Sequence, residues 1–402
     1  MDIINKIAII GLGYVGFPLA KSFSKFYLTV GYDIDIDLVD SLNKKKHKNL
    51  IISHDSDFIK DANVFIITVP TPITKKNLPD LSYLKSASET VAKYIKKNDV
   101  VIYESTVYPG VTEDICVPIL ESSSKLRYNK DFFCGYSPER ISPGDKSKCL
   151  EKIIKITSGS NSKTANFVDD LYRKIVKAGT YKVSSIKIAE AAKVIENTQR
   201  DVNIALMNEF AMMFDHLEIP TNEVLEAAKT KWNFIDYKPG LVGGHCIGVD
   251  PYYLIYKSKQ SGYIPDLMSI SRKINNSVSE FVINKVKNEI DCSSKNKTHD
   301  ILVLGYTFKE NCSDIRNTKV SDIVSGLRKI NCNVDIYDPL LKMDNIMTKN
   351  PFKSSKKYDI VILAVAHDVF YELKKEDFDN ISQGNLVLLD LKNVYNFATW
   401  KF

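Results

Sequence analysis

A glycine-rich turn between a short apolar strand and a helix-like segment is the feature that most restricts how this chain can fold. The expected strand Lys6–Ile10 runs directly into Gly11-Leu12-Gly13-Tyr14-Val15-Gly16, and the helix-like segment continues to about Phe26. A second expected strand, Leu28–Tyr32, ends in Asp33. GxGxxG alone is a weak signal, but here a strand, a helix and an acid closing the next strand frame it. That combination is typical of a dinucleotide-binding βαβ unit.

The residues of this unit favour one dinucleotide over the other. Gly11 and Gly13 allow the tight turn and let a pyrophosphate approach the helix N-terminus, while Gly16 permits close packing of the helix on the strand. Asp33 can accept hydrogen bonds from the adenosine ribose and would repel a 2′-phosphate. The sequence therefore predicts NAD rather than NADP. The alternative is a similar fold that binds no nucleotide.

Three polar loops follow further expected strands. Val64–Val69 leads into Pro-Thr-Pro, and Val100–Tyr103 leads into a loop with Thr106. Such loops line the ligand crevice of an open α/β sheet, so Thr71 and Thr106 are candidate nicotinamide contacts, or else only turn and capping residues. The third loop, 135–144, follows the strand-like segment 132–134 and holds two prolines and two glycines.

That third loop presents Glu139 beside Arg140. Proline and glycine at turn positions restrict the loop at low entropic cost. A carboxylate held in so constrained a loop is a candidate general base or water-positioning group.

One long helix is expected from about Ile186 to Leu217, because apolar residues recur there at helical spacing. Lys193 and Asn197 are four residues apart, so they share a face, and Arg200 lies a step further along. Most helical lysines are only solvated, but apolar neighbours predict partial burial of Lys193. An amine beside a carboxamide suits an oxyanion, and a helix this long often forms a subunit interface. The apolar positions are Ile188, Ala192, Ile195, Val202, Leu206, Phe210, Met213 and Leu217.

A cysteine loop follows an aromatic and basic segment, 231–240. It reads Gly243-Gly244-His245-Cys246, with Asp250 four residues after the cysteine. Two glycines let the backbone turn tightly and another molecule come close. A lone cysteine is most often a small buried apolar side chain. In a chain with a dinucleotide fingerprint, however, the combination predicts that Cys246 is a nucleophile working alongside NAD.

The last part of the chain is predicted to form a second nucleotide-type sheet. The polar segment 291–298 indicates a boundary. No second GxGxxG is present, so this sheet is expected to hold a different nucleotide, with Lys309 and Arg316 placed to meet its phosphates. The expected strands are Ile301–Leu304, Asn333–Tyr337, Ile360–Val365 and Leu386–Leu389.

Composition excludes several classes of protein. The net charge of +6 is spread over many lysines, and the dense run 44–48 lacks interleaved aromatic residues, so no nucleic-acid partner is expected. Apolar runs are too short for a membrane span, and the first strand begins too early for a signal peptide. Seven cysteines without a CxxC pair favour the reduced cytoplasm over disulfides or a metal site.

The assembled motifs cover essentially the whole chain and resemble the UDP-glucose/GDP-mannose dehydrogenase family. The runs Glu196–Asn203 and Lys231–Phe234 are most similar to bacterial UDP-N-acetylhexosamine 6-dehydrogenases of the Vi-antigen and O-antigen type. The matching pieces are Lys6–Gly16, Thr68–Pro72, Glu104–Gly110, Tyr136–Gly144, Ala189–Glu209, Gly240–Leu254 and Tyr306–Thr318.

The resemblance implies an α/β fold with two Rossmann-like, doubly wound parallel-sheet domains joined by a central helical domain with one long helix. The expected domains are an NAD-binding domain at 1–185, a central helical domain with the cysteine loop at 186–292, and a UDP-sugar-binding domain at 293–402. A cytoplasmic homodimer supplying polysaccharide synthesis is also implied. The segment between Asp33 and Ala62 looks shorter than in relatives, which bears on the adenosine end of the NAD site.

The implied reaction is a four-electron oxidation of the sugar C6 alcohol to a carboxylate by two NAD, through a thiohemiacetal and a thioester on the cysteine. The implied catalytic residues are Cys246, Lys193, Asn197, Glu139, Asp250 and Thr106. The implied NAD contacts are Gly11, Gly13, Tyr14, Val15, Gly16, Asp33, Thr71, Thr106 and Arg316. The implied substrate contacts are Glu139, Arg140, Lys193, Asn197, Arg200, Tyr237, Lys238, Gly243 and Lys309.

Several alternatives remain open from the sequence. UDP-GlcNAc and UDP-GalNAc are not distinguished, and UDP-glucose or UDP-ManNAc is a second choice of substrate. A β-hydroxyacid dehydrogenase would also join a dinucleotide domain to a helical one through Lys and Asn, but it needs no cysteine. A non-catalytic nucleotide-sugar binding protein is the third possibility.

Overall fold

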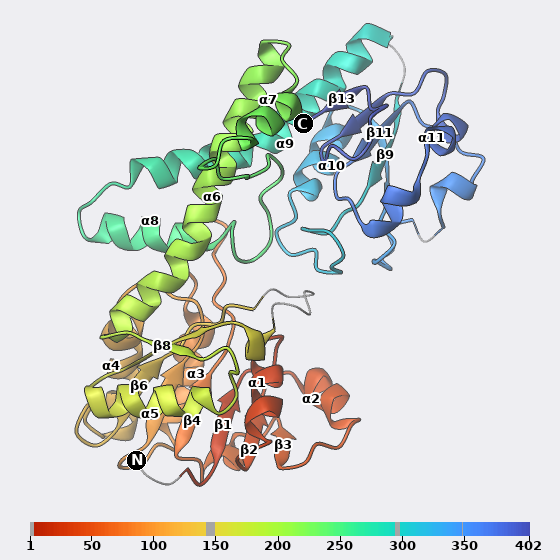
Figure 1. Ribbon diagram of the computed structural model, residues 1–402. Helices are drawn as coiled ribbons and strands as arrows, with labels where there is room; N and C mark the ends of the chain where they lie inside the picture. Colours follow the sequence, from red (N-terminus) through yellow and green to blue (C-terminus); the bar gives the residue numbers. More distant parts are fainter. Residues whose placement is uncertain (1–3, 142–148, 294–297, 348) are drawn as a thin grey trace. The chain divides into compact units, whose positions relative to one another are not determined.

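The computed structural model describes residues 4–141, 149–293, 298–347 and 349–402, with only the backbone at 291–293. It divides into two compact units (Figure 1). The first comprises Met1–Glu196 and Tyr252–Ile264, and the second comprises Asn197–Pro251 and Pro265–Phe402. Part of the expected domain boundary, 294–297, and the end of the third loop, 142–144, lie outside the described residues. The division into three domains stays a prediction.

The first unit is built on an eight-stranded sheet with the order β3-β2-β1-β4-β5-β6-β7-β8. Strand order reverses between β1 and β4, which creates the switch point where α/β sheets bind ligands. Neighbouring strands of this sheet are parallel, except that β6 and β7 are antiparallel to each other. The strands are β1 Ile7–Ile10, β2 Thr29–Tyr32, β3 Leu50–Ser53, β4 Val64–Ile67, β5 Val100–Tyr103, β6 Phe133–Tyr136, β7 Lys155–Gly159 and β8 Thr180–Lys182.

Helices cover this sheet, so its central strands are apolar along their whole length. All four residues of β1, of β4 and of β5 are buried. The segment between Asp33 and Ala62 holds a short helix, α2, then β3 and a 3₁₀ turn. The sequence pattern did not predict β3, β7 or β8. The helices are α1 Gly16–Phe23, α2 Ile36–Asn43, α3 Ser82–Ala92, α4 Val117–Ser124 and α5 Ser162–Arg173, with a π-helical turn at Thr112–Cys116 and short 3₁₀ turns at Ser56–Ile59 and Leu150–Lys152.

The second unit contains a five-stranded sheet, all parallel, with the order β10-β9-β11-β12-β13. Alternate residues of β9 enter different apolar clusters: Ile301 and Val303 join one, and Leu302 and Leu304 join the other. Both faces of this sheet are therefore covered, as expected for a doubly wound fold. The elements are β9 Asp300–Leu304, α10 Val320–Lys329, β10 Asn333–Tyr337, β11 Ile360–Leu363, α11 Lys375–Ile381, β12 Leu388–Asp390 and β13 Trp400–Lys401, with 3₁₀ turns at Pro351–Lys353 and Asp368–Glu372.

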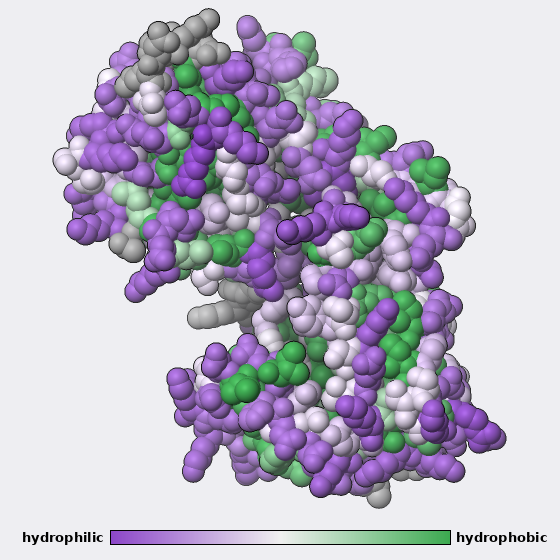
Figure 2. All heavy atoms as spheres, turned by 180° about the vertical axis from the view of Figure 1, so that it is seen from behind, coloured by the Kyte–Doolittle hydropathy of each residue, from purple (hydrophilic) through white to green (hydrophobic). Residues whose placement is uncertain are grey.

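Four helices lie between the sheets in the sequence: α6 Ile186–His216, α7 Thr221–Lys229, α8 Asp250–Gln260 and α9 Asp266–Ser293. The helix predicted at 186–217 is α6. Its regular apolar positions are largely not buried within the chain, since Ile188, Ile195, Leu206, Met213 and Leu217 are 43–58% exposed. Apolar side chains reach the surface in Figure 2. Among the described residues, no helix has the length and apolarity needed to cross a bilayer.

We expect Gly16→Ala to destabilise the protein, because a Cβ at this position would lie 1.8 Å from the Gly11 carbonyl oxygen. Overpacking of this kind costs about 1–3 kcal/mol. Gly13→Ala is the matched control, since a Cβ there meets nothing within 4 Å. Urea unfolding without nucleotide measures both variants. Equal unfolding midpoints for the two would contradict the role assigned to Gly16.

Candidate active site

The glycine turn after β1 is shaped by close backbone contacts. Gly11 has a φ of +90°, in the region that favours glycine, and its carbonyl accepts a 2.7 Å hydrogen bond from the Thr68 hydroxyl. The missing Cβ of Gly16 lets α1 begin directly against that carbonyl. Gly13 has open space where a side chain would be, which leaves room for a phosphate to approach.

Asp33 lies at the carboxyl end of β2 and is tied to the same turn. Its Oδ2 accepts the Leu12 N–H at 2.6 Å, and its Oδ1 accepts the Asp35 N–H at 3.0 Å. Val15 precedes α1 without a side-chain capping bond, and Tyr14 is largely exposed. These residues fit NAD: an open glycine turn faces a helix N-terminus, and an acid stands beside it.

The structure brings Thr71 and Thr106 together. The Thr71 hydroxyl donates to the Thr106 carbonyl at 2.6 Å, and the Ser105 hydroxyl donates to the Val69 carbonyl at 2.6 Å. Tyr253 donates to the Thr71 carbonyl at 2.7 Å. The two loops thus form one hydrogen-bonded edge at the ends of β4 and β5. Their contact with nicotinamide stays a prediction.

Glu139 and Arg140 are both held by neighbouring groups. Glu139 Oε1 accepts the N–H groups of Arg140 and Ile141 at 2.6 and 2.7 Å. The Arg140 guanidinium pairs with Glu196 of α6 at 2.7 Å and donates to the Ile154 carbonyl at 2.7 Å. Arg140 therefore links its loop to α6 in this structure, and its predicted substrate contact is untested.

Lys193 is 7% exposed, so its predicted burial is confirmed. One turn earlier on α6, the fully buried Glu190 accepts the N–H groups of Gly110 and Thr112 at 2.5 and 2.9 Å. Burial raises the pKa of Glu190 to about 7, while the bond from Gly110 opposes the rise. Glu190 ties the lysine helix to the loop of Thr106. The sequence analysis missed it, although an acid within an otherwise apolar stretch is a usable signal.

In the second unit, Cys246 lies at the entrance to α8. Its side chain is partly exposed, and its carbonyl accepts the N–H groups of Val249 and Asp250 at 3.0 and 2.8 Å. The buried Asp250 in turn accepts a 2.6 Å hydrogen bond from the Asn197 amide. The structure thus joins the predicted acid to the predicted amide by a side-chain bond, and to the predicted cysteine through the backbone.

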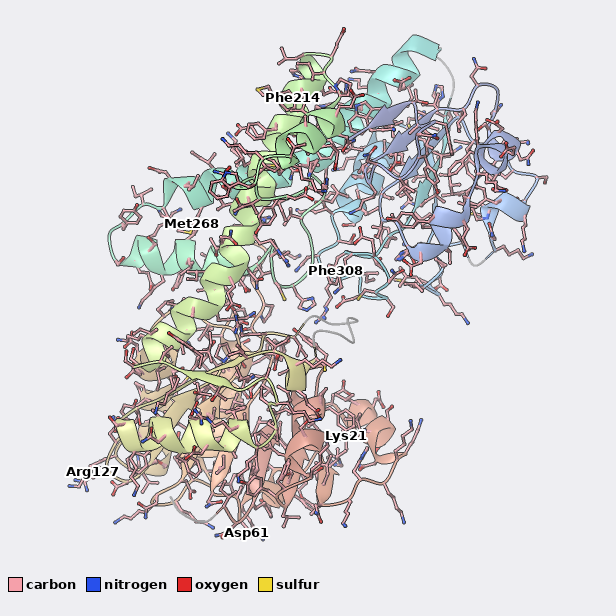
Figure 3. All side chains as sticks on the ribbon, viewed as in Figure 1. Lys21, Asp61, Arg127, Phe214, Met268 and Phe308 are labelled. Carbon is pink, nitrogen blue, oxygen red and sulfur yellow. The ribbon has the colours of Figure 1, made fainter. Side chains whose placement is uncertain are left out.

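The two glycines before the cysteine allow its loop to pack on the second sheet's loop. A Cβ on Gly243 would lie 2.6 Å from the Asn317 carbonyl oxygen, and one on Gly244 would lie 2.6 Å from the ring of Phe308, which is labelled in Figure 3. His245 Nδ1 lies 3.7 Å from Asp314, which also pairs with Arg316. The Gly244 N–H also donates to the Asn317 carbonyl at 3.3 Å, so the cysteine loop packs on the segment that holds Arg316.

The remaining predicted substrate residues contact side chains outside the cysteine loop or the ring of Phe308. The Tyr237 hydroxyl bonds Gln199, next to the exposed Arg200. Lys238 pairs with Glu226 and Asp236 at 3.0 and 3.2 Å. Lys309 Nζ lies 5.6 Å from the centre of the Phe308 ring.

The second sheet repeats the aspartate seen in the first. Asp338, directly after β10, accepts the N–H groups of Tyr306 and Thr307 at 2.7 and 3.2 Å, and it pairs with His367 at 2.9 Å. The layout therefore echoes the first sheet, as the sequence predicted. The buried His367 was not foreseen, because it follows β11 without a local motif.

Three family models match consecutive parts of the sequence. They are the NAD binding domain at 5–176, the central domain at 187–277 and the UDP binding domain at 302–397, all described as UDP-glucose/GDP-mannose dehydrogenase family. The chain belongs to this family. It is an NAD-dependent nucleotide-sugar dehydrogenase, and the predicted family, fold class, enzyme class and cofactor are confirmed.

Relatives match over nearly the full length. A UDP-N-acetyl-D-glucosamine 6-dehydrogenase of Pseudomonas aeruginosa is 48% identical, covering 96% of each chain. One of Salmonella typhi is 47% identical, covering 97% of this chain and 96% of its own. Among solved structures, the UDP-D-ManNAc dehydrogenase of Pyrococcus horikoshii has a TM-score of 0.91 at 31% identity and covers 98% of both chains.

We expect Glu190 to make stability fall as the pH rises. Its pKa is about 7 in the folded protein against 4.5 ordinarily, so between these values the unfolded chain loses a proton that the folded chain keeps. This contribution to the free energy of unfolding is about 3 kcal/mol below pH 4.5, where it is fully present. It decreases as the pH rises and is lost above about pH 7.

Urea unfolding of the wild type and Glu190→Gln between pH 5 and 7.5 measures this effect. The variant is expected to show the flatter dependence, with Glu89→Gln, an exposed acid, as the control. Parallel pH curves for wild type and Glu190→Gln would contradict the prediction.

Proposed function

We propose that this enzyme oxidises the C6 alcohol of a UDP-N-acetylhexosamine to the carboxylate, with UDP-N-acetylglucosamine as the favoured substrate. The carrying observation is the 48% and 47% identity to full-length relatives named for that sugar. A UDP-N-acetyl-D-mannosamine dehydrogenase of Methanocaldococcus jannaschii is only 32% identical over comparable coverage. The difference favours the glucosamine-type sugar over the mannosamine type.

Cys246 is proposed as the covalent nucleophile. Bound NAD supplies the hydride acceptor for each of the two oxidations. The Cys246 thiolate adds to the C6 aldehyde after the first oxidation and remains bonded to that carbon, as a thioester, after the second. Covalent capture keeps the reactive aldehyde from escaping between the two steps. The partial exposure of the cysteine in a tight glycine loop supports this role.

Asn197 and Lys193 are proposed to stabilise the oxyanions. Asp250 accepts one hydrogen of the Asn197 amide and thereby orients it, and the same nitrogen carries a second hydrogen that can reach an oxyanion. Lys193 lies four residues earlier on α6, where helical geometry places the two side chains on one face. Glu139 and Thr106 are proposed to position water and manage protons.

The NAD and substrate contacts are proposed with the same residues that the family resemblance implies. Gly11, Gly13, Gly16 and Asp33 form a turn that suits a dinucleotide, and Arg316 is proposed as a further cofactor contact. The proposed sugar-nucleotide contacts are Arg140, Arg200, Tyr237, Lys238, Gly243 and Lys309.

A homodimer working in the cytoplasm is proposed as the functional form. Leu206 and Met213 of α6, Leu217 directly after it, and Leu267 and Ile270 of α9 are 43–67% exposed in the single chain. Exposed apolar rows on long helices are typical of subunit interfaces. No disulfide joins the cysteines whose side chains the structure describes, which suits a reducing compartment. The product would serve polysaccharide synthesis.

We expect Cys246→Ser to stop turnover after the first oxidation. Steady-state NADH formation is expected to fall by several orders of magnitude, because the hydroxyl of serine is a far weaker nucleophile at neutral pH. Cys149→Ser, a partly exposed cysteine in the first unit, is the matched control and is expected to keep wild-type rates. Unchanged steady-state kinetics of Cys246→Ser would refute the covalent scheme.

A panel of UDP-sugars tests the proposed substrate. The wild type is expected to form two NADH per molecule of UDP-N-acetylglucosamine, with lower kcat/KM for the galactosamine and mannosamine analogues and for UDP-glucose. NADH absorbance and product mass measure the stoichiometry. One NADH per substrate would instead favour a single oxidation, as in β-hydroxyacid dehydrogenases, and no NADH with any sugar would overturn the proposal.

A further inference from the structure

Three ionisable side chains from separate segments meet inside the first unit. Lys155 of β7 lies 2.6 Å from Glu104, which follows β5, and 3.2 Å from Glu139, which follows β6. The side chains of Lys155 and Glu104 are 2% and 0% exposed, and that of Glu139 is 13% exposed. Lys155 therefore bridges a fully buried carboxylate and one nearer the surface.

The surroundings keep this lysine charged and in place. The Tyr172 hydroxyl of α5 donates to the other oxygen of Glu104, and Lys155 Nζ lies 5.3 Å from the centre of the Tyr172 ring. Burial alone would lower the pKa of Lys155, but Glu104 and Glu139 outweigh it and raise the pKa above its usual value. Such a buried cation is stable because carboxylates accompany it.

Glu139 is thereby held at both of its oxygens. Oε1 accepts two backbone N–H groups of its own loop, and Oε2 faces Lys155. A single contact would leave the carboxyl plane free to rotate about the last side-chain bond. Contacts at both oxygens restrict that rotation, as a group that must hold a water molecule requires.

The second ion pair of Lys155 indicates that it does more than neutralise a buried acid. One lysine is enough to neutralise the deeper acid, Glu104, and that pair alone would satisfy the buried strand. The second contact, to Glu139, reaches toward the less buried side of the cluster. Glu104 and Tyr172 hold the Lys155 amine in place, and the amine in turn contacts Glu139.

We propose that Lys155 is a positioning residue that fixes the Glu139 carboxylate for the hydrolysis of the acyl-enzyme. In that step a water oxygen bonds to the thioester carbon and the carbon–sulfur bond breaks. The electron pair stays on the cysteine sulfur, and Glu139 takes the proton that the water loses. The inference rests on the role of Glu139 in the proposed function.

A pair of neutralising variants tests the proposal. Lys155→Met is expected to lose stability and activity together, because two buried carboxylates lose their cation. Lys155→Met/Glu104→Gln removes the buried excess charge, so its stability is expected to return toward the wild type. Its kcat is expected to stay about 10–100-fold low, since Glu139 keeps its backbone contacts at Oε1 but loses the contact at Oε2. Glu104→Gln alone keeps the contact between Lys155 and Glu139, and its amide oxygen can still accept from Lys155, so its kcat is expected to lie above that of the double variant.

Mass spectrometry of the enzyme during turnover supplies a readout that a purely structural role would not change. The double variant is expected to accumulate the acyl group on Cys246, whereas the wild type clears it. Should the double variant not fold, Lys155→Gln/Glu104→Gln replaces the ion pair by two amides that can bond each other, and the same result is expected.

Each outcome is decisive. A double variant with wild-type kcat and no acyl-enzyme would show that Lys155 only balances Glu104, which overturns the proposal. A wild type that forms neither NADH nor an acyl-enzyme with UDP-N-acetylglucosamine would instead refute the proposed function. Glu139→Gln tests whether Glu139 itself takes part in the hydrolysis. If this variant clears the acyl group at the wild-type rate, Glu139 has no role in that step and the inference about Lys155 is wrong.

Discussion

In each sheet, an aspartate that follows the second strand along the chain holds the turn that follows the first strand. Asp33 accepts the Leu12 N–H in the first unit, and Asp338 accepts the N–H groups of Tyr306 and Thr307 in the second. A charge-assisted bond to backbone N–H is stronger than a neutral one, so each turn is restrained before a nucleotide arrives. The geometry of both turns depends on these bonds.

Buried carboxylates in this enzyme act chiefly by holding other groups. Glu190 fixes a loop to α6, Asp250 orients Asn197, and Glu104 anchors Lys155. Burying an acid is costly unless hydrogen bonds or an opposite charge offset the lost hydration. Each of these acids has such partners, and the same contacts fix the orientation of the neighbouring group.

The long helix α6 shows a limit of periodicity as a guide. Its apolar residues predicted the helix almost to the residue, yet Leu206 and Met213 are exposed while Ala205 and Met207 are buried. Periodicity reports that a face is apolar, and it does not report what covers that face. The proposed homodimer would cover this face.

Local patterns in the sequence determined the glycine turn, Asp33, the extent of α6 and the cysteine loop before Asp250. These features depend on backbone conformation and on residues close together in the chain, so short motifs are enough to predict them. The assignment of NAD followed from the same motifs.

Only the tertiary structure decided which distant side chains meet. Lys155 and Glu104 are 51 residues apart, and Glu190 and Gly110 are 80 residues apart, so no local pattern connects them. The antiparallel pairing of β7 with β6, which brings Lys155 into the sheet, was equally invisible. A buried charge is stabilised by whichever groups the fold brings to it, and those groups are known only once the strands have been ordered.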